Sequence, residues 1–492
     1  MFHEYTTARV QSLLLLLFLC ASLIGCATSR QTVAPSVEDY IPPAFSQRGP
    51  SSQEPSASAS DPILETPESN ASTEAPSTEA LNLAACVDIA LDRNPVNLAA
   101  RQGVIIAEET LGIARAPYYP EVAVKSAWSR YQRRAFLPTG VTQLAGSGII
   151  GPTDDWLAGF TARYTIADGG RRAAEYRRAT ALKSTAEEEA QRMRQDIVFE
   201  VHSSFYHLAA AMQVRSIAEE NFSRAEAHLH LAQRLKEAGA VPKVDVLRAE
   251  VEVAEAKLAL TRASGLTRTI RGQLSIAMGL PAASRFEIDT GSHQAVSPAL
   301  SAPEEIIGEA LRARPEINAA LQQISADEAG VAAAKSAYRP RLYAEAGYNY
   351  RDNDFPPEDE EWLVALNLNW TLFSGFSRKH DVNRARAELS RQEAEIQQLI
   401  LQVQQEVLAA HSTVLETWES VETTEAQVAS AQESMRATRT RYEVGAATIN
   451  DLLDAQTALA HAETNRAESI WNLFIAKAWL DRVRGQSRVT GS

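Results

Sequence analysis

Cysteine is scarce in this chain of 492 residues: only Cys20, Cys26 and Cys86 occur, and their spacing supports neither a disulfide framework nor a four-thiolate zinc site. Positive charge is also in deficit, because 48 Lys and Arg residues face 62 Asp and Glu residues, for a net charge of −14. Such a chain lacks the basic surface that nucleic acid requires. The composition therefore excludes a nucleic-acid partner and favours neutral or cationic ligands.

Common catalytic signatures are also missing. The chain has no Gly-x-x-x-x-Gly-Lys loop, His-Glu-x-x-His helix, Gly-x-Ser-x-Gly elbow or paired CxxC. His202, His207, His228 and His230 lack the i, i+4 spacing of a helical metal pair, and we interpret them as solvated or groove-lining. Cys86 is interpreted as a small apolar residue of an amphipathic helix. We therefore expect no enzyme activity, no metal and no cofactor.

Only one long apolar run occurs, and it follows Arg9 near the N-terminus. Its length is typical of a signal-peptide core and too short for a spanning helix. The segment Leu23-Ile24-Gly25-Cys26 resembles the bacterial lipobox. We expect residues 1–25 to be a signal peptide and Cys26 to carry diacylglycerol and N-palmitoyl groups, with Ala27 implying sorting to the outer membrane. The alternative is an ordinary signal peptide with an incidental cysteine.

Residues 26–80 are rich in Ser, Pro, Ala, Thr and Glu, so we expect a lipidated N-terminus followed by a disordered tether. Beyond them the chain repeats itself, which predicts a first structural repeat over residues 81–292, a second over 301–485 and a tail over 486–492. Pro95 matches Pro315 and Pro120 matches Pro340, and the members of each pair are 220 residues apart. Trp156 matches Trp362, Gly169 matches Gly375 and Gly239 matches Gly445, and the members of each of these pairs are 206 residues apart. A period this long indicates a duplicated domain half and not a solenoid.

Each half is predicted to run helix, helix, strand, strand, long helix, long helix. Proline ends the first helix of each half because it lacks the N–H and clashes with the preceding turn. The strand segments alternate in period two, with apolar and aromatic residues on one face. The opposite face carries polar side chains, namely Lys125, Arg163, Glu345, Asn367 and Asn369. Strands of about ten residues with this pattern fit a tilted transmembrane strand whose polar face lines a wet lumen, although a half-solvated soluble sheet has the same alternation.

Four strands cannot close a barrel, and an open sheet edge in lipid leaves backbone groups unpaired. The chain is therefore expected to oligomerise. Helical patterns over residues 171–238 and 377–444 would each reach roughly 100 Å at 1.5 Å per residue. Their apolar residues recur at spacings of three and four, which predicts coiled-coil packing. A closed helical tube and a long antiparallel coiled coil without a lumen both satisfy this periodicity.

Each pair of long helices is joined by a turn with a glycine, Gly239 or Gly445, and an aspartate six residues later, Asp245 or Asp451. Glycine ends a helix where a positive φ is needed, and an aspartate in the next first turn meets the positive end of the helix dipole. Helix capping thus explains both aspartates. The turns, the duplication and the order of proline, strands, glycine and helix resemble the TolC family of outer-membrane efflux ducts, in its lipoprotein branch.

The resemblance implies a mainly α fold with a small β-barrel part: a homotrimer with a shared twelve-stranded outer-membrane β-barrel, continued by a periplasmic α-helical coiled-coil barrel. It also implies a lipid-anchored protein of the bacterial outer membrane that conducts small molecules such as drugs passively to the exterior. The implied partners are a periplasmic membrane-fusion (adapter) protein, a proton-driven inner-membrane transporter and outer-membrane lipid. The outlet of a type I protein-secretion system has the same fold and remains an alternative.

The resemblance further assigns roles within the two turns. The residues implied to dock the adapter are Arg234, Gly239, Arg441 and Gly445, and those implied to form the periplasmic gate are Asp245, Tyr442, Asp451 and Asp454. Ala447 stands where some family members have an arginine that bonds across the gate, so this closing contact is absent. Aspartates around a narrow lumen would favour cations there. A non-conducting, lipid-anchored coiled-coil spacer is the structural alternative, but it leaves the polar strand face unexplained.

Overall fold

The computed structural model describes residues 80–131, 154–291 and 295–486. The predicted signal peptide, Cys26 and the tether lie outside these residues. Within the described ranges, no helix is both long enough and apolar enough to cross a membrane.

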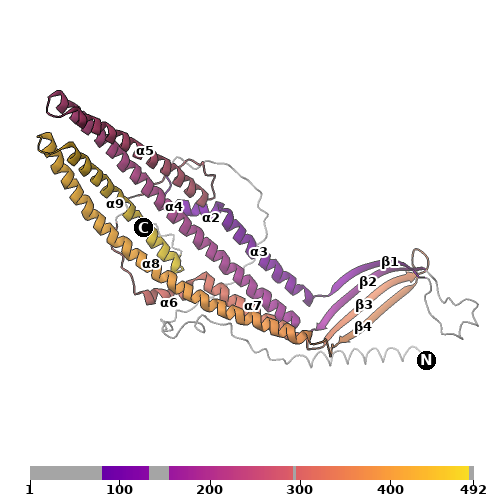
Figure 1. Ribbon diagram of the computed structural model, residues 1–492. Coiled ribbons are helices and arrows are strands. Elements are labelled where there is room, and N and C mark those ends of the chain that lie inside the picture. Colours follow the sequence, from indigo (N-terminus) through magenta and orange to yellow (C-terminus); the bar gives the residue numbers. More distant parts are fainter. Residues whose placement is uncertain (1–79, 132–153, 292–294, 487–492) are drawn as a thin grey trace, which may run out of the picture. The chain divides into compact units, whose positions relative to one another are not determined.

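The predicted order of elements is confirmed in both halves (Figure 1). The first half comprises α2 (Leu83–Arg93), α3 (Pro95–Arg115), the short η3 (Ala116–Tyr118), β1 (Glu121–Arg130), β2 (Asp154–Ala167), α4 (Arg171–Glu237) and α5 (Lys243–Ala277). The second comprises α6 (Pro303–Ala313), α7 (Pro315–Ser336), β3 (Arg341–Asp352), β4 (Glu360–Asn369), α8 (Ser377–Glu443) and α9 (Ile449–Val483). Proline opens α3 and α7 because its missing N–H is not needed in a first turn.

In each half, a hydrogen bond joins the end of the last helix to the residue that separates the first two helices. In the first half, Asn94 caps α3, and its Nδ2 donates to the carbonyl of Ala277 at 2.9 Å. In the second half Arg314 takes that place, and its Nε donates to the carbonyl of Val483 at 2.6 Å. Arg314 is only 2% exposed, and its guanidinium lies 2.7 Å from the carboxylate of Glu406. The two halves thus contain equivalent contacts at this position, made by different side chains.

The strands form one antiparallel sheet in the order β1-β2-β3-β4, so β1 and β4 are its edges. The register sets Val124 beside Phe160, Phe160 beside Tyr348, and Tyr348 beside Trp362. The predicted apolar face is therefore continuous across all four strands. The alternation is confirmed, and it arises because successive side chains point to opposite faces.

The long helices pack as antiparallel pairs, α4 with α5 and α8 with α9, and α7 packs against both α4 and α8 (Figure 1). Both predicted seams are confirmed as core. On α4 the seam residues Ile197, Val201, Phe205 and Leu208 are buried, and on α8 so are Ile396, Val403, Val407, Ala410 and Val414. The α8 seam packs against residues of α6, α7 and α9, so these helices share one apolar core.

Two minor predictions have different outcomes. Cys86 is fully buried in the core around α2, and burial raises the pKa of its thiol to about 12, which agrees with an inert apolar role. His228 is also buried, with 4% of its surface exposed, so its interpretation as a solvated histidine is wrong. The burial of His228 was not predicted because it lies where α4 meets the other hairpin, and periodicity along α4 does not indicate contacts with other helices.

Candidate functional site

The turns that join the long helices have the same backbone geometry in both halves. We call residues 234–247 the first tip and residues 441–454 the second tip. Gly239 and Gly445 have φ angles of 73° and 75°. The N–H of the residue after each glycine donates to a carbonyl in the last helical turn, Ala240 to Leu235 at 2.8 Å and Ala446 to Arg441 at 2.7 Å. This bonding satisfies carbonyls that a helix end leaves free, and it explains the glycine at each position.

The aspartates that follow the two glycines are held differently. Asp451 forms a capping box with Thr448: Asp451 Oδ2 accepts from the backbone N–H of Thr448 at 2.7 Å, and Thr448 Oγ1 accepts from the N–H of Asp451 at 3.2 Å. Bonds from the backbone and hydroxyl of Thr448 lower the pKa of Asp451. Asp245 lies in the first turn of α5, but this helix has no side-chain cap. The capping explanation therefore holds in full only for Asp451.

Tyr442 lies inside the second tip. It is 2% exposed and clusters with Met435, Ile449 and Leu452, while Leu231 of α4 packs against the same cluster. Burial raises the pKa of the Tyr442 hydroxyl, and the nearby Asp245 carboxylate raises it further. The structure thus brings together two of the four predicted gate residues, one from each hairpin.

The remaining predicted tip residues lie on the surface. Arg441 is exposed and donates to the carbonyl of Ala446 at 3.2 Å, and its charge contributes to the lowered pKa of Asp451. Asp454 and Arg234 are exposed as well. Ala447 packs against the Tyr442 cluster. Because a gate would form between protomers, the gate and docking roles of these residues remain predictions.

Polar contacts between α4 and α9 join the two hairpins, and the sequence does not predict them. Arg224 on α4 lies 2.7 Å from the Glu463 carboxylate on α9. Near it, Nε2 of the fully buried Gln456 donates to Asn221 at 3.2 Å. These partners are more than two hundred positions apart, and no spacing rule within one sequence pairs them.

His228 lies beside this contact and is kept neutral by its surroundings. Burial lowers the pKa of His228 to about 4, and the positive charges of Arg439 and Arg224 act in the same direction against the weaker effect of Glu443. Its Nε2 has no hydrogen-bond partner among the described residues. His228 is therefore a buried imidazole that burial and two nearby positive charges keep uncharged.

The sheet exposes an apolar face to its surroundings. Val124 is 73% exposed and Val364 is 75% exposed, although both lie within strands. The register places the predicted polar residues together on the other face, where the Arg163 guanidinium lies 3.6 Å from the carboxylate of Glu345. Lys125, Asn367 and Asn369 share this face. Their assignment to a lumen remains a prediction.

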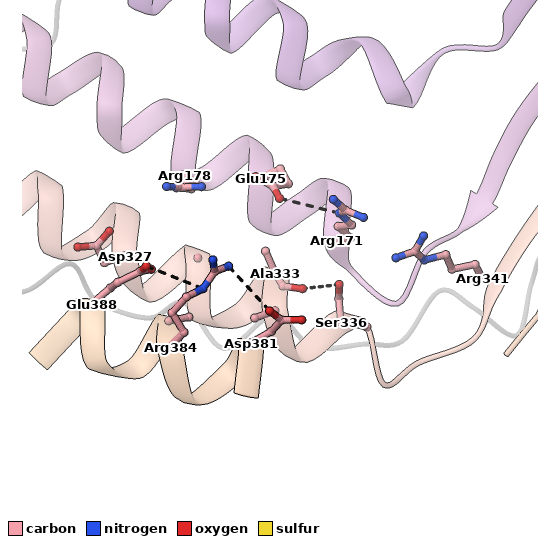
Figure 2. Close-up of a pocket in the computed structure, with 14 residues that line it drawn as sticks. Arg171, Glu175, Arg178, Asp327, Ala333, Ser336, Arg341, Asp381, Arg384 and Glu388 are labelled. Carbon is pink, nitrogen blue, oxygen red and sulfur yellow. Dashed lines mark hydrogen bonds and ion pairs between the residues drawn. The ribbon is translucent and has the colours of Figure 1, made fainter. Parts of the chain in front are cut away.

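A cavity of about 320 Å³ lies where α4, α7 and α8 begin or end near the sheet, and charged side chains of both signs line it (Figure 2). Arg171 pairs with Glu175 along α4, and Arg384 pairs with Asp381 and Glu388 along α8. These pairs are exposed and separated by 3.9 to 4.0 Å, so each is weak. Arg341 also borders the cavity, and Figure 2 draws it without an ion pair to the other lining residues.

Comparison with known proteins identifies relatives of this architecture. The family model described as outer membrane efflux protein matches residues 86–280 and 306–485. Protein CyaE of Bordetella pertussis is 29% identical over 324 residues, which span 63% of this chain and 63% of that protein, less than two thirds of its length. The probable efflux pump outer membrane protein TtgC of Pseudomonas putida is 24% identical over 358 residues, or 71% of this chain and 72% of that protein. The solved outer-membrane channel OprN shares the fold, with a TM-score of 0.72 at 20% identity over 82% of this chain and 90% of that one.

Proposed function

The chain belongs to the outer membrane efflux protein family, and we propose that it forms the exit duct of a tripartite efflux system that conducts small molecules, such as drugs, to the exterior. Membership of this family also makes the chain an outer-membrane transport protein and not an enzyme. The observation that carries the proposal is the sheet, which has one apolar exposed face, one charged face and two edges, β1 and β4, that pair with no further strand of the described residues.

The free edges argue for a shared barrel. In hydrocarbon the unpaired backbone groups of β1 and β4 would each cost several kcal/mol. Pairing β1 of one protomer with β4 of the next removes both edges, and a homotrimer then closes a barrel of about twelve strands, within the range that such barrels use. The apolar face then contacts lipid, and the polar face lines the lumen.

The long helices offer matching surfaces for neighbouring protomers. Leu401, Leu408 and Leu415 are exposed at intervals of seven residues along α8. Val244, Val251 and Leu258 are exposed at the same interval along α5. A heptad stripe that stays exposed within one chain is suited to coiled-coil packing against another chain. Packing of these stripes between protomers would extend the barrel as a helical tube across the periplasm.

The remaining assignments complete the proposed duct. Cys26 carries diacylglycerol and N-palmitoyl groups and adds a lipid anchor, in which each buried CH₂ contributes roughly 0.8 kcal/mol. The two tips dock a periplasmic adapter and close the duct, and a proton-driven inner-membrane transporter supplies substrate and energy. Asp451 and Asp454 would favour cations at the constriction, a hypothesis to be dropped if Asp451→Ala and Asp454→Ala leave ion permeability ratios unchanged.

Single-channel recording tests the duct directly. The purified protein, extracted in detergent, is reconstituted in planar bilayers beside the Asp451→Ala/Asp454→Ala variant. Asp88→Ala serves as the matched control, because Asp88 is an exposed carboxylate on α2, outside the tips. We expect discrete conductance that changes in the tip variant and not in the control.

Two other outcomes lead to the alternatives. Electrical silence of both wild type and tip variant favours the non-conducting spacer, or a gate that opens only with its adapter. The outlet of a type I secretion system would conduct as well, so the substrate decides. Deletion of the gene should lower the inhibitory concentration of small-molecule drugs if the protein is an efflux duct, and should instead abolish export of a protein if it is a secretion outlet.

A further inference from the structure

Arginine dominates the wall of a second cavity, of about 530 Å³, where the sheet meets the helices. Arg163 comes from β2, Arg339 from the segment before β3, Arg341 from the start of β3 and Arg378 from the first turn of α8. No aspartate or glutamate is among the described residues that line it. We call this cavity the arginine pocket.

Arg378 is fixed in place without a carboxylate partner among the described residues. Its Nη2 donates to the carbonyl of Leu372 at 2.9 Å and its Nε to the hydroxyl of Ser374 at 3.0 Å, and the guanidinium lies over the ring of Tyr338 at 5.1 Å. These groups orient the guanidinium but leave its charge uncompensated.

The first half of the chain has an equivalent arginine with equivalent contacts, but a carboxylate neutralises the charge of that arginine. Arg172, which lies 206 residues before Arg378, donates to the carbonyls of Thr165 and Ile166 and lies over the ring of Tyr118. Its Nε, however, is 3.1 Å from the carboxylate of Asp168. Ser374 occupies the position equivalent to Asp168, so the second half keeps the geometry of this contact without its negative charge.

Arg341 shows the same divergence between the halves. It is the first residue of β3, and its counterpart at the start of β1 is the acidic Glu121. The register sets Glu121 beside Arg163, whereas it sets Arg341 beside Asn369. Arg341 is exposed and has no ion pair or side-chain hydrogen bond among the described residues (Figure 2).

The other two arginines add to the positive charge. Arg339 donates to the carbonyl of Gly169 at 3.1 Å. Of the four arginines, only Arg163 has a carboxylate of a described residue within 4 Å, that of Glu345. Four guanidinium groups around one cavity repel one another unless an anion lies between them. Guanidinium groups also match the geometry of carboxylates and phosphates, which they bind through paired hydrogen bonds.

We propose that the arginine pocket binds the anionic group, phosphate or carboxylate, of a solute in the duct. The inference rests on the proposed function, because Arg163 and Arg341 lie on the strand face that we place toward the lumen. A trimer would present one pocket from each protomer, at the opposite end of the long helices from the tips. A preference for anions here is compatible with a preference for cations at the tips, because the two sites are separated by the length of α8.

Phosphate binding to the detergent-solubilised protein tests the pocket without requiring conduction. Inorganic phosphate is titrated by calorimetry at low ionic strength against wild type, Arg341→Gln and Lys125→Gln. Lys125 is the matched control, since it carries a positive charge on the same strand face but does not line the pocket. We expect saturable binding that Arg341→Gln weakens about tenfold, the effect of losing one charge-assisted hydrogen bond, while Lys125→Gln changes it less than about twofold.

The outcomes separate the pocket from the duct. Binding that is absent, or equally strong in Arg341→Gln, overturns the pocket whatever the bilayer recordings show. Saturable, Arg341-dependent binding by a protein that is silent in bilayers supports the pocket independently of the proposed duct. Repeating the titration with added phosphatidylglycerol identifies the source of the anion: competition indicates a lipid headgroup, and its absence indicates a free solute.

Discussion

Removal of the ion pair between Arg224 and Glu463 should loosen the tips. The pair joins α4 to α9 at 2.7 Å, and its side chains are 26% and 18% exposed, so solvent screens it only in part. A partly buried, charge-assisted contact of this kind contributes about 1–2 kcal/mol. If closure of each protomer depends on it, the ratio of closed to open forms should fall by roughly 5- to 30-fold per protomer.

The assay is the open probability of single channels in planar bilayers. Arg224→Ala and Glu463→Ala should each raise it, and the exchange of Arg224→Glu with Glu463→Arg should restore closure in part. Arg436→Ala is the matched control: it removes a 2.6 Å pair with Glu433 that is 74% and 64% exposed and lies within α8 alone. Trimers that remain folded and show unchanged open probability in both single variants would refute the reasoning.

Other perturbations give further tests. Arg314→Met should lower the free energy of unfolding by about 1–3 kcal/mol, because it leaves the carbonyl of the buried Val483 without its donor, while Glu406 is half exposed and can be solvated; thermal denaturation in detergent measures this, with the exposed Arg101→Met as control. Thr448→Ala should cost about 1 kcal/mol by the same assay. It should also weaken the acid dependence caused by Asp451, whose lowered pKa stabilises the fold above the ordinary aspartate range and ceases to do so as pH falls through the lowered value. The pKa of His228 falls from 6.5 to about 4 on folding, so the unfolded chain binds a proton at a higher pH than the folded chain. About 3 kcal/mol of the free energy of unfolding should therefore be lost as the pH falls from 6.5 to about 4. His228→Leu should abolish this loss, and an unchanged pH profile of unfolding would count against the assignment.

The features that were predictable from the sequence depend on local periodicity. The alternation around Phe160 and Tyr348 fixed the strand faces, and the three-and-four spacing around Val403 fixed the α8 seam, because each follows from the geometry of one element. The glycines at 239 and 445 were interpretable for the same reason: a positive φ is a property of a single residue.

Contacts between distant elements could not be obtained in this way. Nothing near Arg224 in the sequence indicates Glu463, and Arg439, whose charge helps to lower the pKa of His228, belongs to another hairpin. The contacts of Arg172 and Arg378 did leave a signal, since each arginine follows a matched glycine by three residues in its own half. Comparing the halves position by position would have found this pair, and would also have shown that its acidic partner is missing from the second half.

The same comparison leads to a prediction about the tips, which are equivalent in position but unequal in construction. At the positions of Tyr442 and Thr448, the first tip has the exposed Lys236 and Pro242, and Pro242 provides no side-chain cap. Its core is also smaller, formed by Ala232, Val246, Ala249 and Leu229, against the second tip's Met435, Tyr442, Ile449, Leu452, Ala455 and Leu459.

Fewer buried apolar contacts and a missing cap lower the free energy of local opening. Backbone amides of residues 236–246 should therefore exchange with deuterium faster than those of residues 442–452 in the detergent-solubilised protein. A Pro242→Thr substitution, which supplies the missing capping residue, should slow exchange in the first tip toward the rate of the second. Equal rates in the wild-type tips would mean that contacts between protomers, and not the construction of each hairpin, determine how the tips move. Faster exchange in the first tip would instead identify the α4–α5 hairpin as the part of each protomer that yields when the duct opens.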